Sequence, residues 1–165
     1  MEENTLNGFP KVAEVLERYG AEFIELYKSN LVASGRPASG KLAESLSYHV
    51  DLGTNVYAVD ISLLEYWKYI ENGTRPHFPP ISAIREWIRV KPVIPRPFAN
   101  GKLPTESQLA FLIARKISRV GTEGTNDFER ASKEIFDRML MSLAEAVTED
   151  LHRQVSVIFT DFATR

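Results

Sequence analysis

The residues best suited to acid–base or metal chemistry are the three histidines, His49, His77 and His152. On a strand, His49 and Asp51 would point to the same face, where an imidazole and a carboxylate could bind a metal ion or move a proton. Two ligands do not make a metal site, and no histidine has a partner at a recognised spacing. A small metal-dependent enzyme built on His49, Asp51 and Asp60 is therefore the alternative interpretation. We expect no enzyme, and no catalytic, cofactor-binding or metal-binding residue.

Phosphate-binding motifs are incomplete in this sequence. Gly35 and Gly40-Lys41 have the spacing of a phosphate-binding loop, but Leu42 stands where a Ser or Thr hydroxyl must hold magnesium. Gly121-x-x-Gly124 follows no predicted strand and is interpreted as a linker. The absence of cysteine excludes disulfides, thiolate metal sites and cysteine nucleophiles. Nucleotide chemistry is accordingly not indicated.

Composition and charge indicate an ordinary globular chain. Its 165 residues match about one domain, with 44% hydrophobic and 25% charged residues. A formal net charge of -2 lacks the basic excess typical of proteins that grip nucleic-acid phosphates. No run approaches the ~20 apolar residues of a membrane span, and the acidic N-terminus resembles no targeting signal. We expect one domain over residues 1–165, without membrane contact.

The elements that must position these residues follow from hydrophobic periodicity. A 3.6-residue stripe predicts a helix over residues 10–29, and residues 30–40 are turn formers. Alternating apolar residues over 46–52 and 57–63 predict an antiparallel hairpin with one apolar face, which the first helix should cover. The order of helix, hairpin and further helices indicates an α+β fold.

The later elements are helices separated by proline- or glycine-rich loops. They comprise a short helix over 64–71, a helix over 82–91, a helix opened by a capping box at 105–108 and ended at Gly121, and a last helix from Asp127. The last helix is expected to end near Gln154, because the run over 155–160 is rich in β-formers. Residues 151–165 are thus predicted to hold a C-terminal strand or arm.

Aromatic residues gather in and around two stiff proline-rich loops at 74–80 and 91–104. Such residues can complete a small core under the loops, which is what we expect of Tyr69 and Trp87. Exposed aromatic side chains beside arginines are also typical anchors of protein interfaces. A candidate assembly interface is predicted from eleven residues: Trp67, Tyr69, Glu71, Gly73, Thr74, Arg75, His77, Phe78, Pro79, Arg96 and Phe98.

Three segments resemble one known family. Ser39-Gly40-Lys41-Leu42 with Ser45-Leu46, the hairpin after it, and Tyr66-Trp67-Lys68-Tyr69-Ile70-Glu71-Asn72-Gly73-Thr74 resemble the core pattern of the tail-completion, or head–tail connector, proteins of tailed bacteriophages. Phe78-Pro79-Pro80-Ile81 with Arg85-Glu86-Trp87-Ile88 is similar to a segment of some minor virion proteins. Arg96-Pro97-Phe98 is similar to a step that often precedes a helix in these proteins.

The resemblance implies a non-catalytic virion protein that forms a homo-oligomeric ring at the phage neck. Other neck, portal or tail proteins are the implied partners, and DNA passes through the ring without being specifically bound. Assembly would take place in the cytoplasm of the host bacterium, and no cofactor is implied. A ring needs two different patches on each subunit. We expect one at residues 73–80 and the other on a helix face or the C-terminal arm. A bacterial adaptor or toxin-like module outside the virion is the other alternative.

Overall fold

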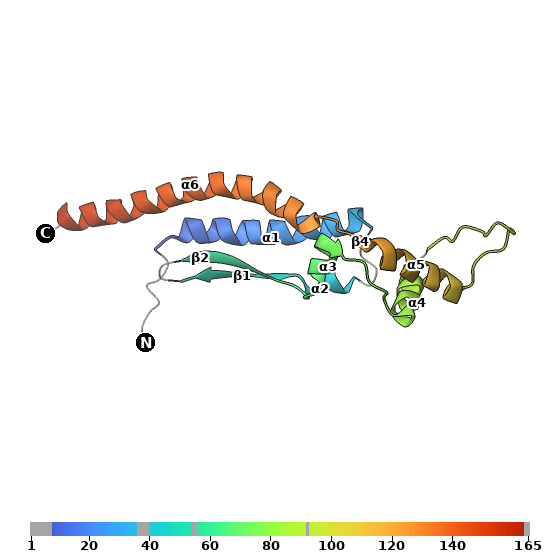
Figure 1. The fold of residues 1–165 in the computed structure, drawn as a ribbon. Helices are drawn as coiled ribbons and strands as arrows, with labels where there is room; N and C mark the ends of the chain where they lie inside the picture. Colours follow the sequence, from blue (N-terminus) through green and yellow to red (C-terminus); the bar gives the residue numbers. More distant parts are fainter. Residues whose placement is uncertain (1–7, 36–39, 54–55, 92, 164–165) are drawn as a thin grey trace. The chain divides into compact units, whose positions relative to one another are not determined.

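The computed structural model describes residues 8–35, 40–53, 56–91 and 93–163 of the chain. Ser39 of the quoted motif and residues 164–165 of the expected arm lie outside the described residues. The elements in chain order are α1 (Pro10–Ala33), α2 (Lys41–Ser45), β1 (Ser47–Leu52), β2 (Tyr57–Ser62), α3 (Trp67–Asn72), β3 (Gly73–Thr74), α4 (Ile81–Val90), α5 (Glu106–Val120), β4 (Thr122–Glu123) and α6 (Asp127–Ala163). This mixture of helices with small antiparallel sheets confirms the predicted α+β class (Figure 1).

The chain divides into two compact units, each of which is described by itself. The first unit holds residues 1–30, 45–63 and 128–165. The second unit holds residues 31–44 and 64–127.

The hairpin of the first unit is antiparallel and has one apolar face, as predicted. Tyr48 lies opposite Ile61 and Val50 opposite Val59, so the apolar side chains share one face. Helix α1 covers this face, as expected, since Gly20 approaches the ring of Tyr48 so closely that an added Cβ would lie 2.6 Å from Cδ2. Val12, Leu16, Val50 and Ala146 form the buried cluster between α1, the hairpin and α6. Each larger apolar side chain among them contributes about 1.5–3 kcal/mol on burial.

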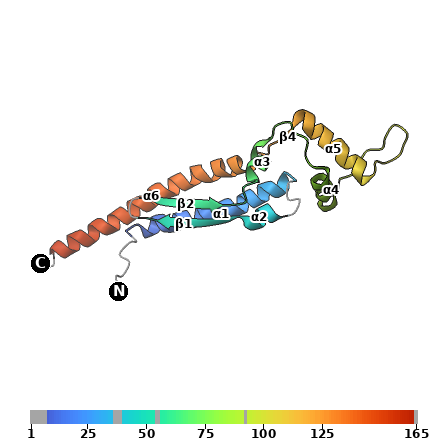
Figure 2. The ribbon, with the colours of Figure 1, turned by 60° about the horizontal axis from the view of Figure 1, so that its bottom comes forward.

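Helices α1 and α6 run side by side in opposite directions (Figures 1 and 2). At one end of the pair, Asp150 Oδ2 accepts hydrogen bonds from the backbone N–H groups of Lys11 and Val12, at 2.8 and 3.1 Å. At the other end, the Phe128 ring lies edge-on to Phe23, with centroids 5.1 Å apart. The long C-terminal helix therefore closes the core that α1 and the hairpin begin.

Two helix ends differ from the sequence-based predictions. Helix α6 continues to Ala163, so the strand or arm expected at residues 151–165 is wrong for the described part of that segment. The apolar spacing Leu151, Val155, Phe159 fits a helix, and it outweighs the β-propensity of valine and isoleucine. Helix α1 also runs four residues past the predicted end, and α2 was not foreseen.

The second unit contains a two-residue antiparallel ladder between β3 and β4, in which Gly73 faces Glu123 and Thr74 faces Thr122. Gly121-x-x-Gly124 is therefore part of a strand pair and not a simple linker. Only glycine fits there: a Cβ on Gly73 would lie 2.0 Å from the Thr122 carbonyl oxygen, and Gly73 has a φ of 73°. The pairing joins two segments about 50 residues apart in the sequence.

Helices α4 and α5 pack against each other beyond this ladder. The predicted capping box at the start of α5 is confirmed, because Thr105 Oγ1 accepts the N–H of Gln108 while Gln108 Oε1 accepts the N–H of Thr105. In the part of the chain that the structure describes, no helix is long and apolar enough to span a membrane.

Candidate assembly interface

The predicted interface residues fall on three consecutive parts of the second unit. Trp67, Tyr69 and Glu71 belong to α3, whereas Gly73 and Thr74 form β3. The remaining residues lie in the loops on either side of α4: Arg75, His77, Phe78, Pro79, Arg96 and Phe98.

The ladder between β3 and β4 fixes the end of α3. The N–H groups of Thr125 and Asn126 donate to the carbonyl oxygens of Ile70 and Glu71, at 3.0 and 3.3 Å. Those carbonyls belong to the last turn of α3, whose acceptors otherwise lack helical partners. The hydroxyl oxygens of Thr74 and Thr122 lie 3.0 Å apart and add a bond across the ladder. The aromatic face of α3 therefore rests on a rigid base.

Five of the predicted residues line one open hollow. Tyr69, Gly73, Thr74, Arg75 and His77 surround it, together with Pro76. His77 Nδ1 donates to the Arg75 carbonyl oxygen at 2.9 Å, which turns the loop back on itself. Tyr69 is 65% exposed, so the expectation that it completes a core is wrong. The structure thus gathers a tyrosine, an arginine and a histidine on one accessible surface.

Two predicted interface residues are buried instead. Glu71 is 6% exposed and Pro79 is also buried. The backbone of Glu71 is engaged by the Gly121–Asn126 side of the ladder, and an added Cβ on Gly124 would lie 2.1 Å from the Glu71 carbonyl oxygen. These two residues position the surface and do not form it.

The loops around α4 bring Phe78 and Phe98 to the surface, but not to one place. The Phe78 ring lies 6.2 Å from that of Phe111 in α5, and both remain half-exposed. Phe98 sits in a tight turn in which its N–H donates to the Lys102 carbonyl oxygen at 2.9 Å. Arg96 is exposed in the same loop. Phe111 was missed because the hydrophobic periodicity predicts an apolar stripe that leaves it out, formed by Leu109, Leu112, Ile113, Ile117 and Val120. The buried residues of α5 are instead Ala110 and Ala114.

The segment 75–120 exposes many apolar side chains. We call this segment the arm; it is a different segment from the C-terminal arm expected at residues 151–165. Helix α4 is amphipathic, yet none of its ten residues is buried. Trp87 keeps 37% of its surface exposed, contrary to the expectation of a small core. The arm's large exposed apolar residues are Phe78, Trp87, Val90, Ile94, Phe98, Leu103, Phe111, Leu112 and Val120. The sequence signal for this surface is the apolar spacing of Ile84, Trp87 and Ile88 in a short helix between two proline-rich loops; their exposure is visible only in the structure.

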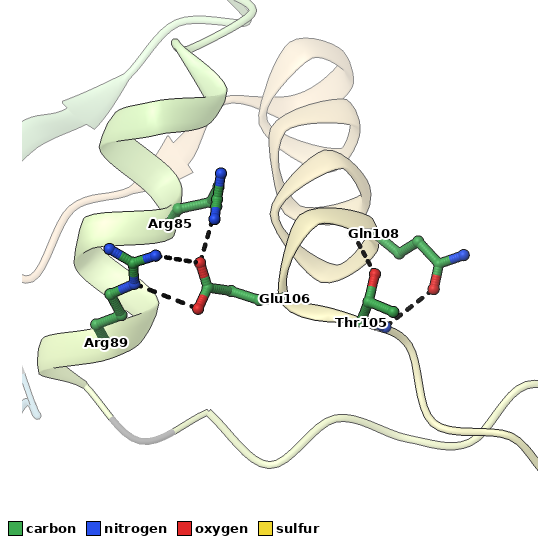
Figure 3. Close-up of polar contacts among 5 residues, drawn as sticks. All are labelled: Arg85, Arg89, Thr105, Glu106 and Gln108. Atoms are coloured by element: carbon green, nitrogen blue, oxygen red, sulfur yellow. Dashed lines mark hydrogen bonds and ion pairs between the residues drawn. The ribbon is translucent and has the colours of Figure 1, made fainter.

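A charged clamp holds the arm together. Glu106 at the start of α5 accepts from Arg85 Nε at 2.8 Å and from Arg89 Nη2 at 3.0 Å (Figure 3). These two guanidinium groups lower the pKa of the Glu106 carboxyl below its ordinary value of 4.5. The clamp sets the two helices relative to each other without covering their apolar faces.

The residues of the alternative metal site share one strand face. His49 lies directly opposite Asp60, and Asp51 is two positions along β1, with all three side chains exposed. Among the described residues, no three His, Asp or Glu side chains are grouped so that they could hold a metal ion. The arrangement offers no observation that favours this alternative.

Comparison with known proteins gives no further guide: no family model, no curated protein and no solved structure matches this chain.

Proposed function

We propose that this chain is a structural virion protein of a tailed bacteriophage, which forms a ring at the head–tail junction around the DNA channel. The order of the motifs from Gly40 to Phe98 supports this proposal, because it resembles the core pattern of the connector proteins. Other neck, portal or tail proteins are the proposed neighbours in the particle. The protein would assemble in the host cytoplasm and remain in the virion.

The observation that carries the proposal is the uncovered apolar surface of the arm. Monomeric proteins rarely expose large contiguous apolar patches, and such patches commonly mark an interaction site. Helix α4 presents an amphipathic face with no buried residue, and rigid loops hold aromatic side chains beside it. Aromatic and arginine residues are the side chains that most often anchor protein interfaces. An assembly subunit accounts for this surface directly.

Catalysis and cofactors have no part in the proposal. The ring would give DNA a passage and not a specific binding site, so the bases of the DNA would not be read. This expectation follows from the connector resemblance.

Particles provide the experiment. The chain should be detected by mass spectrometry in particles of the phage or prophage that encodes it, and antibody–gold labelling should mark the neck. Particles made without the chain should accumulate as heads and tails that fail to join. Joined, infectious particles that lack the chain would contradict the proposal and would favour a bacterial adaptor module.

A further inference from the structure

The net charge of the chain conceals two oppositely charged parts. The arm, residues 75–120, has nine Lys and Arg residues but only two acidic residues, Glu86 and Glu106. The first unit has the opposite balance, with fifteen acidic and eight basic residues in its three segments. The value of -2 therefore describes neither part, and an argument from net charge alone misses both.

The positive charge of the arm is largely unpaired. Glu106 is taken up by Arg85 and Arg89. The other basic side chains of α5 and the loops are exposed and form no ion pair within the described ranges: Arg75, Arg96, Lys102, Arg115, Lys116 and Arg119. Arg115 and Arg119 follow Phe111 at four-residue spacing, so they share its side of α5. The exposed side of α5 is thus both apolar and basic.

Helix α6 has a second apolar face that the first unit does not cover. Its buried face consists of Ala131, Ile135, Ala146 and Asp150. On another side lies a stripe of apolar residues that are 38–56% exposed: Phe136, Leu140, Val147, Leu151 and Val155. From Phe136 to Val155 the stripe extends over about 28 Å of helix. We call it the outer stripe.

The unpaired charge next to the outer stripe is negative. Asp137 lies one turn before Leu140, at the edge of the outer stripe, and Glu145 lies further round the helix on the same side as Met141; both carboxylates are exposed without an ion pair in the described parts of the chain. Three basic residues of α6 are paired locally, because Lys133 pairs with Glu129, Arg138 with Glu22 and Arg153 with Asp150. The outer stripe is therefore apolar, and the unpaired charge at its edge is the Asp137 carboxylate.

We propose that the arm of one copy docks on the outer stripe of α6 in a second copy of this chain. Apolar surfaces with opposite unpaired charges on each side provide both burial and complementarity, the two features that stabilise and orient a protein interface. The two patches differ, so the contact is heterologous and can continue from copy to copy until a ring closes. This inference rests on the proposed ring.

A protein partner fits the arm better than DNA does. Phosphate contacts use basic side chains, whereas Ile94, Leu103 and Val90 are aliphatic and 93%, 62% and 54% exposed. Aliphatic side chains gain most from burial against another apolar surface, such as that of the outer stripe. Docking on the outer stripe of a second copy would also cover the positive charge of the arm in the assembly.

Charge reversal tests the contact. We expect Arg115→Glu/Arg119→Glu in the arm, and Asp137→Lys/Glu145→Lys on α6, each to weaken self-association of the full chain at least about tenfold, because like charges then meet. Mixing the two variants, or combining all four substitutions in one chain, should restore association. Light scattering and sedimentation at 50 mM salt measure the assembly, and circular dichroism checks that each variant folds.

Matched controls reverse equal numbers of exposed charges elsewhere. Lys41→Glu/Lys68→Glu and Glu44→Lys/Glu65→Lys should leave association within twofold of the original chain. The inference would be overturned if association is unchanged by either reversal or does not recover on mixing. It would also be overturned if the arm variant loses only its binding to DNA and still associates as the original chain does. A chain that is monomeric alone but labels the phage neck would overturn this contact while leaving the proposed virion role intact.

Discussion

Asp150 in α6 caps the first turn of α1, where its Oδ2 accepts the backbone N–H of Lys11 at 2.8 Å across 139 positions of the sequence. The first turn of α1 has no acidic residue of its own, and Phe9 before it has no side-chain acceptor. The Asp150 side chain is 1% exposed. A carboxylate at this place satisfies N–H groups that have no helical partner and complements the positive end of the helix dipole.

Asp150→Ala is therefore expected to lower the free energy of unfolding by about 1–3 kcal/mol, because buried donors lose their acceptor. Asp150→Asn retains an acceptor oxygen and should lose less. Urea unfolding measures both variants against Asp137→Ala, an exposed aspartate on the same helix that should change stability by no more than about 0.5 kcal/mol. Equal losses in Asp150→Ala and Asp137→Ala would remove the capping role.

Gly73→Ala should disrupt the β3–β4 ladder, since the new Cβ would lie 2.0 Å from the Thr122 carbonyl oxygen. We expect a loss of at least about 2 kcal/mol in thermal or urea unfolding. Gly101→Ala is the matched control, because its φ of 75° is similar and no atom lies within 4 Å of the added Cβ. That control should show only the cost of a left-handed backbone, about 1 kcal/mol. Similar losses at both positions would refute the steric explanation.

The Glu106 clamp predicts a pH dependence confined to acidic conditions. Because Arg85 and Arg89 lower the folded-state pKa of Glu106 below 4.5, the ion pairs contribute fully above the unfolded value and are lost as pH falls through the folded value. Carboxyl NMR titration should therefore place the Glu106 midpoint below 4.5, and Arg85→Gln/Arg89→Gln should raise it. A Glu106 midpoint unchanged by removal of both arginines would contradict the clamp.

Removal of residues 155–165 should leave the core of the first unit intact. Val155, Val157 and Phe159 are exposed, and Gln154, which bonds to the Gly8 carbonyl oxygen, is retained. We expect a loss of helical signal in circular dichroism and a change of less than about 1 kcal/mol in the free energy of unfolding. A cooperative loss of the fold on truncation would show that this part of α6 is needed for it.

Local patterns were enough to predict the elements whose burial has a strict period. The alternation in β1 and β2 predicted the hairpin and its apolar face, and Thr105 with Gln108 predicted the start of α5. Both features depend on residues that are close in the sequence.

Features built from distant residues were not predictable in this way. The β3–β4 ladder depends on the close approach of Gly73 to Gly124 and of Gly121 to Thr74, and no local pattern states that two such segments pair. The burial of Glu71 follows from the same pairing. For the candidate interface, the proline-rich loops were recognised, but the exposure of Phe111 and Trp87 required the packing of α4 on α5.

The most direct test of the assembly role is the molar mass of the purified chain over a concentration series, alone and mixed with its neck partners, by size-exclusion chromatography with light scattering. We expect a ring-sized oligomer, or a complex with at least one neck protein, that weakens as salt screens the charged surfaces. A monomer under both conditions, with no partner bound, would contradict the account.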